Sequence, residues 1–153
     1  RDVWVTVAPE VQQFCRENRI VPADLTLRLE QLLGVPPHNG KTRFVEFDVK
    51  PEDLFRPSPD PEITDREAQL DFPPGTSEDH RKWFADLQAV SYGENGYPWT
   101  RLGYTYDWGQ THSHIGLTEY VIRIGATVNV DSVTLTADYC YAGSDVNEWS
   151  LYK

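Results

Sequence analysis

The chain has few of the residue types that would point to several common functional classes. Its 153 residues include two cysteines and no methionine, and 14 lysines and arginines stand against 24 aspartates and glutamates. Two cysteines cannot build a multiply bridged scaffold or a zinc site made of paired CxxC motifs. The net charge of −10 repels phosphate backbones, which argues against general nucleic-acid binding.

Long apolar runs and complete catalytic motifs are also missing. No hydrophobic stretch approaches the roughly 20 residues of a membrane-spanning helix, so no membrane span is expected. The sequence has no GxSxG motif, no HExxH motif, no EF-hand loop and no glycine-rich phosphate loop after a strand. Hydrophobic residues nevertheless make up 39% of the chain, enough for the core of a soluble domain. We expect one globular domain over residues 1–153.

Hydrophobic patterning predicts an α+β fold, an antiparallel sheet with about three helices packed on one face. The expected helices lie within residues 8–20, 24–33 and 77–92. In the second, Leu25, Leu29, Leu32 and Leu33 form an apolar stripe that Gly34 should end, and Ser77 should cap the third. Strands are expected at 3–7, 42–49, 99–108 and 117–124. Two further strands, at 126–131 and 133–140, are expected to form a C-terminal meander with its turn at Asp131 and Ser132.

Prolines and acidic residues are concentrated in the middle of the chain. Residues 46–79 contain 11 acidic and 3 basic residues, and six of the prolines fall within residues 50–76. This composition predicts an acidic surface loop at about 50–76, with one helical turn at its start. The negative electrostatic field of these acidic residues also favours a basic partner, so an acidic inhibitor of a basic protein is one functional alternative.

The two cysteines are far apart in the sequence. Cys15 falls on the apolar face of the first expected helix. Cys140 instead falls at one of the alternate positions of the last expected strand that carry polar residues. A disulfide between them requires that helix to pack over the end of that strand. A disulfide favours an exported protein, periplasmic or extracellular, and two free thiols in a cytosolic protein are the alternative.

The stretch DWGQTHSHIGLTEY, residues 107–120, contains a closely spaced histidine pair. If this part of the chain is extended, His112 and His114 point to the same side and could bind a divalent metal ion such as zinc, copper or nickel. Glu119, Asp107 or His80 would then supply a third ligand. A solvated loop bounded by glycines is the alternative explanation.

The same stretch could instead carry acid–base chemistry. His112 or His114 and Glu119 have the chemistry of a general acid and a general base, and Arg101 could stabilise developing negative charge. These residues suggest a small hydrolase, metal-assisted or not, as a second functional alternative. The alternation of the sequence does not place them on one side of a strand.

Aromatic residues are densest just before this histidine loop. The candidate binding residues in this segment are Trp99, Tyr104, Tyr106 and Trp108. Alternation puts the last three on one face of a strand, where they would bind a protein or a small molecule if no helix covers them. A place in the core is the alternative for the tryptophans. The leading interpretation is a small acidic binding domain that uses this strand and the adjacent histidine loop.

Overall fold

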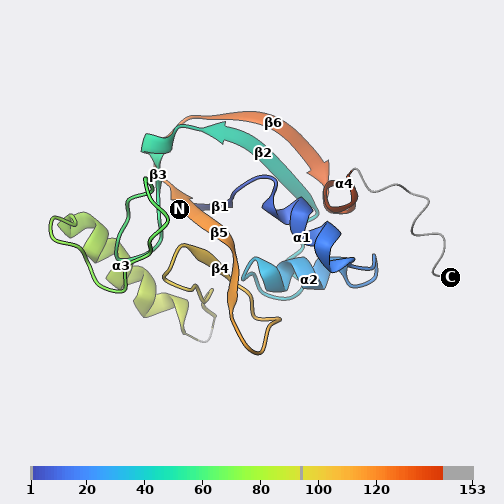
Figure 1. The fold of residues 1–153 in the computed structure, drawn as a ribbon, viewed down its shortest axis with the longest axis horizontal. Helices are drawn as coiled ribbons and strands as arrows, with labels where there is room; N and C mark the ends of the chain where they lie inside the picture. Colours follow the sequence, from blue (N-terminus) through green and yellow to red (C-terminus); the bar gives the residue numbers. More distant parts are fainter. Residues whose placement is uncertain (1, 94, 143–153) are drawn as a thin grey trace.

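The computed structural model describes residues 2–93 and 95–142, and it confirms the predicted α+β class with antiparallel sheets (Figure 1). The strands are β1 (Val3–Thr6), β2 (Arg43–Val49), β3 (Leu54–Phe55), β4 (Tyr104–Tyr106), β5 (Ile115–Ile122) and β6 (Val128–Leu135). The helices are α1 (Glu10–Asn18), α2 (Leu25–Leu32), α3 (Glu78–Ser91) and α4 (Thr136–Tyr141), and a 3₁₀ turn covers Pro51–Asp53.

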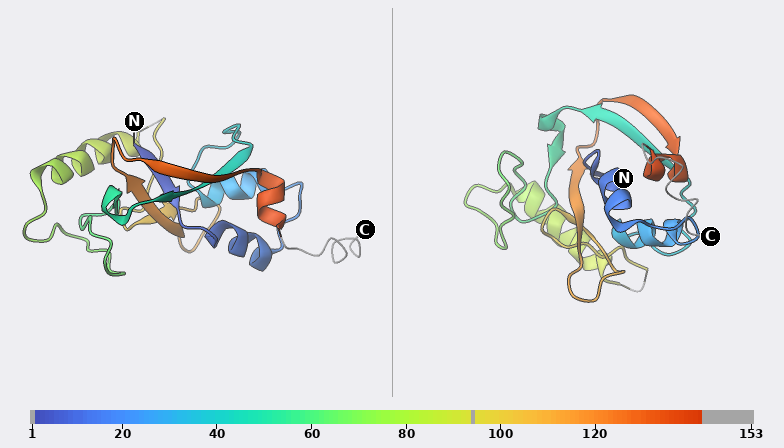
Figure 2. Two further views of the ribbon diagram at one scale, coloured as in Figure 1. Left: turned by 90° about the horizontal axis from the view of Figure 1, so that it is seen from above. Right: turned by 45° about the vertical axis from the view of Figure 1, so that its right-hand side comes forward.

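Strand β5 organises the larger sheet. It pairs antiparallel with β1 through residues 119–122, with β3 through Val121 and Ile122, and with β4 through residues 115–118. Strands β2 and β6 form a separate two-stranded sheet, which arches over α1 in Figure 1. Figure 2 shows α3 and α4 at opposite ends of the molecule. The strands therefore have α3 at one end of the molecule and α4, with α1 and α2, at the other.

The first core lies between α1, α2 and α4. Of the four leucines predicted to form the apolar stripe of α2, Leu25, Leu29 and Leu32 are buried there, and Leu33 packs against them partly buried. Gly34 follows the C-cap of this helix at φ +66° and ends it as the sequence predicted. A disulfide joins Cys15 of α1 to Cys140 of α4, with the Cα atoms 5.5 Å apart.

The C-terminal meander predicted from the sequence is wrong in two respects. Residues 128–135 form one continuous strand, paired with β2, and the expected turn at Asp131 is instead a β-bulge. In the sequence, the alternation of valines with polar residues changes phase at Asp131, and this change resembled a turn. The bulge explains it, because the extra residue places Val130 and Val133 on the same face of the strand. The chain then forms α4, so Cys140 is buried on a helix and does not lie on the polar face of a strand.

The second core is aromatic and lies against α3. Ser77 caps this helix as predicted, its Oγ accepting a hydrogen bond from the His80 backbone N–H. Trp83 of α3 packs against Trp4 of β1 and Phe55 of β3, with ring centroids 6.2 and 4.9 Å apart. The helix is thereby fixed to two strands of the larger sheet.

Part of the proline-rich segment is internal, which corrects its interpretation as a surface loop throughout. Residues 55–60 are all buried. Backbone groups that would otherwise be unpaired find partners there: Ser58 N–H donates to the Arg56 carbonyl, and the Ser58 carbonyl lies 2.8 Å from His80 Nε2. The acidic residues after position 61 remain at the surface or half-buried.

Within the described residues, no helix is both long and apolar enough to cross a membrane.

Candidate functional site

A cavity of about 490 Å³ lies beside β4 and β5. Four parts of the chain form its wall: the start of α1, residues 56–68 of the proline-rich segment, the turn before β4, and alternate residues of β5. Its volume falls in the range of small-molecule sites, roughly 300–1,000 Å³. Apolar side chains of Val7 and Leu102 share the wall with charged and phenolic groups.

Arg56 holds one side of this cavity in place. Its side chain is only 6% exposed, and its guanidinium donates hydrogen bonds to the backbone carbonyls of Asp65 and Glu67, the former at 2.6 Å. The Asp65 carboxylate adds an ion pair with an N–O distance of 3.6 Å. Gly103 lets this arginine approach, because a Cβ at that position would lie 2.6 Å from Arg56 Cγ. The arginine therefore fastens residues 65–67 over the cavity.

Glu10 holds another part of the cavity wall in place. Its two carboxylate oxygens accept hydrogen bonds from the backbone N–H and the hydroxyl of Thr118, both at 2.8 Å. The residue also begins α1, where the positive end of the helix dipole favours a carboxylate. Glu10 thus ties α1 to β5, and both of its oxygens are used.

The remaining polar groups of the cavity have no partner among the described residues. Tyr104 and Tyr120 are half-buried and line the cavity, and no described residue hydrogen-bonds to either hydroxyl. Arg66 also lines it, and its guanidinium makes no hydrogen bond or ion pair with the described residues. The cavity consequently presents three groups that can donate hydrogen bonds to a ligand.

Asp107, a candidate metal ligand, is used in a structural ion pair. Its carboxylate accepts two hydrogen bonds from Arg28 of α2, at 2.9 and 2.6 Å, and a third from the Gly109 N–H. Its backbone N–H donates to the His114 carbonyl at 2.8 Å. These bonds fix the loop that carries the histidine pair against α2.

The two histidines lie at the surface of that loop. His114 stacks on Tyr106, with ring centroids 4.7 Å apart, and its Nδ1 lies 3.1 Å from the Asp107 carbonyl. His80 lies elsewhere, in the aromatic core, where burial lowers the pKa of its imidazole. Across residues 2–93 and 95–142, no three His, Cys, Asp or Glu side chains are grouped so that they could hold a metal ion.

The residues predicted for acid–base chemistry are distributed over β5 and two loops. Glu119 is 8% exposed on β5, its side chain has no hydrogen bond from the described residues, and burial raises the pKa of its carboxyl to about 8. It lies five positions after His114, which along an extended chain is about 17 Å. The Arg101 guanidinium lies over the ring of Tyr92, 5.6 Å from its centroid.

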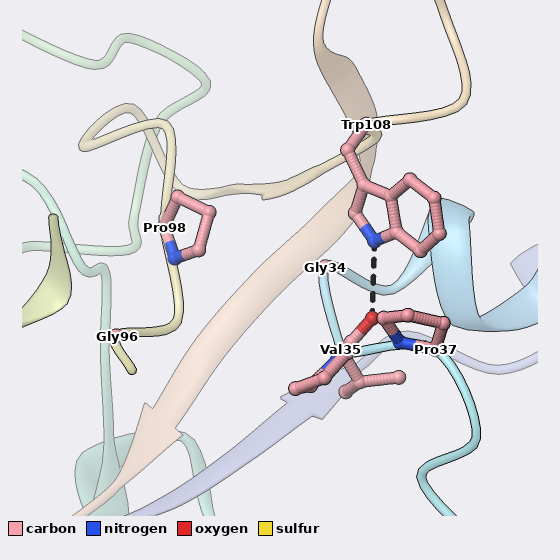
Figure 3. A pocket seen from close by; sticks show the side chains of 7 residues that line it. Gly34, Val35, Pro37, Gly96, Pro98 and Trp108 are labelled. Carbon is pink, nitrogen blue, oxygen red and sulfur yellow. Dashed lines mark hydrogen bonds between the residues drawn. The ribbon is translucent and has the colours of Figure 1, made fainter. Parts of the chain in front are cut away.

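The four predicted aromatic binding residues have four different surroundings. Trp99 is buried between Trp4 and Phe84. Trp108 lines a smaller apolar pocket of about 260 Å³ and donates its indole N–H to the Val35 carbonyl at 3.0 Å (Figure 3).

Of the other two aromatic residues, Tyr106 stacks on His114, and Tyr104 lines the larger cavity. A register shift between Tyr104 and Tyr106 breaks the simple alternation of the strand.

Sequence reasoning did not identify most of the cavity residues. Arg56 and Arg66 are two of only three basic residues in the acidic middle of the chain, and that isolation is the signal which could have marked them. Thr118 and Tyr120 alternate on β5 and could have been assigned to one face. Nothing in the sequence indicates that these segments meet.

Comparison with known proteins gives no family or relative: no protein-family model matches the chain, and searches of curated proteins and of solved structures found no significant similarity.

Proposed function

We propose that this protein is a small ligand-binding domain and that the cavity beside β4 and β5 is its binding site. The observation that carries the proposal is the convergence of unpartnered polar groups on one cavity. Tyr104, Tyr120 and Arg66 come from three separate segments, and none of these side chains is satisfied by the described part of the chain. Binding sites typically combine an apolar wall with a few such convergent polar groups.

The rigidity of the walls also supports binding. Arg56 fastens the proline-rich segment, and Glu10 fastens α1 to β5 through Thr118. A site held open in this way loses little conformational entropy when a ligand enters, which favours affinity.

The pocket beside Trp108 is the weaker candidate. It has about half the volume, and the described residues that line it are glycines, prolines, Val35 and Trp108, without an ionisable side chain. Its one side-chain donor, the Trp108 indole N–H, already has a partner in the Val35 carbonyl, as Figure 3 shows. It therefore offers apolar contact but little specificity.

A small-molecule screen with a blocked cavity tests the proposal. Ala68 lines the cavity and is half-buried, so Ala68→Trp should fill it, whereas Ala89→Trp places the same side chain on the exposed surface of α3. Compounds that raise the melting temperature of the wild type should also do so for Ala89→Trp and should have no effect on Ala68→Trp.

Amide chemical shifts would then locate the bound compound. In the wild type, the N–H signals of Gly103, Thr118 and Tyr120 should move on titration. The assignment of the site would be contradicted by compounds that stabilise Ala68→Trp as much as the wild type. It would also be contradicted by compounds that shift only the amide signals of residues near Trp108.

A further inference from the structure

We propose that the ligand carries a carboxylate bound by Arg66, with the hydroxyls of Tyr104 and Tyr120 as further donors, on an apolar body that contacts Val7 and Leu102. This inference rests on the proposed function and specifies the chemical class of the ligand. All five residues line the one cavity.

The balance of hydrogen-bonding groups in the wall points to a ligand rich in acceptors. Three of the four carboxylate oxygens in the cavity wall are already engaged: both Glu10 oxygens bind Thr118, and Asp65 Oδ1 accepts the Glu67 N–H at 2.8 Å and faces Arg56. The unengaged groups are the guanidinium of Arg66 and two phenols. A ligand that brings acceptor oxygens satisfies them without displacing an existing bond.

The charges of the wall favour one negative charge on that ligand. Arg56 and Asp65 compensate each other as an ion pair, and the Glu10 carboxylate is stabilised by the Thr118 donors and the start of α1, which occupy both of its oxygens. Arg66 alone has no counter-ion among the described residues. Its planar fork of donors fits a carboxylate through two parallel hydrogen bonds.

The rest of the protein limits how much negative charge the ligand can carry. A net charge of −10 repels multiply charged anions, so a polyphosphate or a nucleotide would meet an unfavourable field on approach. One carboxylate on an apolar body meets less of this repulsion and also uses the apolar part of the wall. The geometry therefore favours a small monocarboxylic acid.

The test compares an acid with its neutral isostere. In titrations followed by amide chemical shifts, 3-phenylpropanoate should bind about three- to fivefold more tightly than 3-phenylpropanamide, because Arg66 is exposed and water weakens an ion pair there. Arg66→Gln should remove this preference by weakening the binding of the acid by the same factor while leaving that of the amide unchanged. Tyr120→Phe should weaken the acid by a smaller factor.

Matched controls separate the site from the general charge of the protein. Arg16→Gln changes the net charge equally at an exposed position on α1 outside the cavity, and it should leave both affinities unchanged. The affinity of the acid should also fall as sodium chloride is added, because the ion pair is partly exposed.

The two proposals can fail separately. If the amide binds in the cavity as tightly as the acid, or if only neutral compounds occupy it, the carboxylate assignment is overturned and the binding site stands. If no compound distinguishes Ala68→Trp from Ala89→Trp, the binding site itself is overturned, and the ligand class with it.

Discussion

Arg28 and Asp107, 79 residues apart in the chain, form a two-pronged ion pair between α2 and the loop after β4, with N–O distances of 2.9 and 2.6 Å. The Asp107 side chain is 3% exposed and that of Arg28 is 19% exposed, so the pair is shielded from water. This contact determines where the histidine loop lies. It also occupies one of the three side chains that could have been a third metal ligand beside the histidine pair.

Removing Arg28 should destabilise the fold strongly, because the Asp107 carboxylate would remain buried without its counter-ion. We expect Arg28→Ala to lower the free energy of unfolding by about 3–5 kcal/mol in urea titrations. Arg16→Ala, at an exposed position on α1, should change it by less than about 0.5 kcal/mol. A loss below about 1 kcal/mol for Arg28→Ala would show that Asp107 finds another partner or reaches water.

Reducing the disulfide should also be costly. Cys15 and Cys140 are separated by 125 residues, so the bridge restricts most of the unfolded chain. The chain-entropy model gives about 4–5 kcal/mol for a loop of this length. Urea midpoints of wild type with and without reductant, and of the Cys15→Ala/Cys140→Ala variant, measure the effect. Equal midpoints for all three samples would mean that the packing of α1 on α4 suffices alone.

The buried carboxyl of Glu119 should make stability depend on pH. Its folded pKa of about 8 lies above the usual 4.5, so the folded state holds a proton that the unfolded state has lost. The contribution of Glu119 to stability should therefore be greatest below about pH 4.5, fall as the pH rises towards 8, and then level off. Glu119→Gln should be more stable than wild type by about 2–4 kcal/mol at pH 9 and similar to it at pH 4.

Urea titrations across this pH range, with the exposed Glu17→Gln as control, measure the Glu119 effect. Parallel pH profiles for wild type and Glu119→Gln would show that water reaches this carboxyl.

The helices could be predicted from the sequence because the patterns that define them involve only residues close together in the chain. The apolar spacing of Leu25, Leu29 and Leu32, the cap at Ser77 and the stop at Gly34 each depend on neighbouring residues alone, and each appears as predicted. The bulge at Asp131 was not predictable in this way. When the alternation of apolar and polar residues shifts by one position, the sequence resembles a turn. Only the pairing with the partner strand, here β2, shows that it is a bulge.

The candidate site was less predictable, for the same physical reason. Tyr104 was assigned from its aromatic neighbourhood, but the groups that complete the cavity come from α1, β5 and a segment that looked like a solvated loop. The burial of Arg56 arises from tertiary contacts with the carbonyls of residues 65 and 67. An arginine among acidic residues and prolines has no local pattern that would reveal such burial.

Gly103 should be required both for stability and for the shape of the cavity. It has φ +77°, and a Cβ there would lie 2.6 Å from Arg56 Cγ, so Gly103→Ala should force the buried arginine away from residues 65–67. Gly40 has the same φ with no atom within 4 Å of its Cβ position, so Gly40→Ala measures the backbone strain alone, about 1–2 kcal/mol.

We expect Gly103→Ala to lose more stability than this control in urea titrations and to lose ligand binding, whereas Gly40→Ala retains binding. If the two variants are equally stable and bind equally well, the close packing of Gly103 on Arg56 does not shape the site.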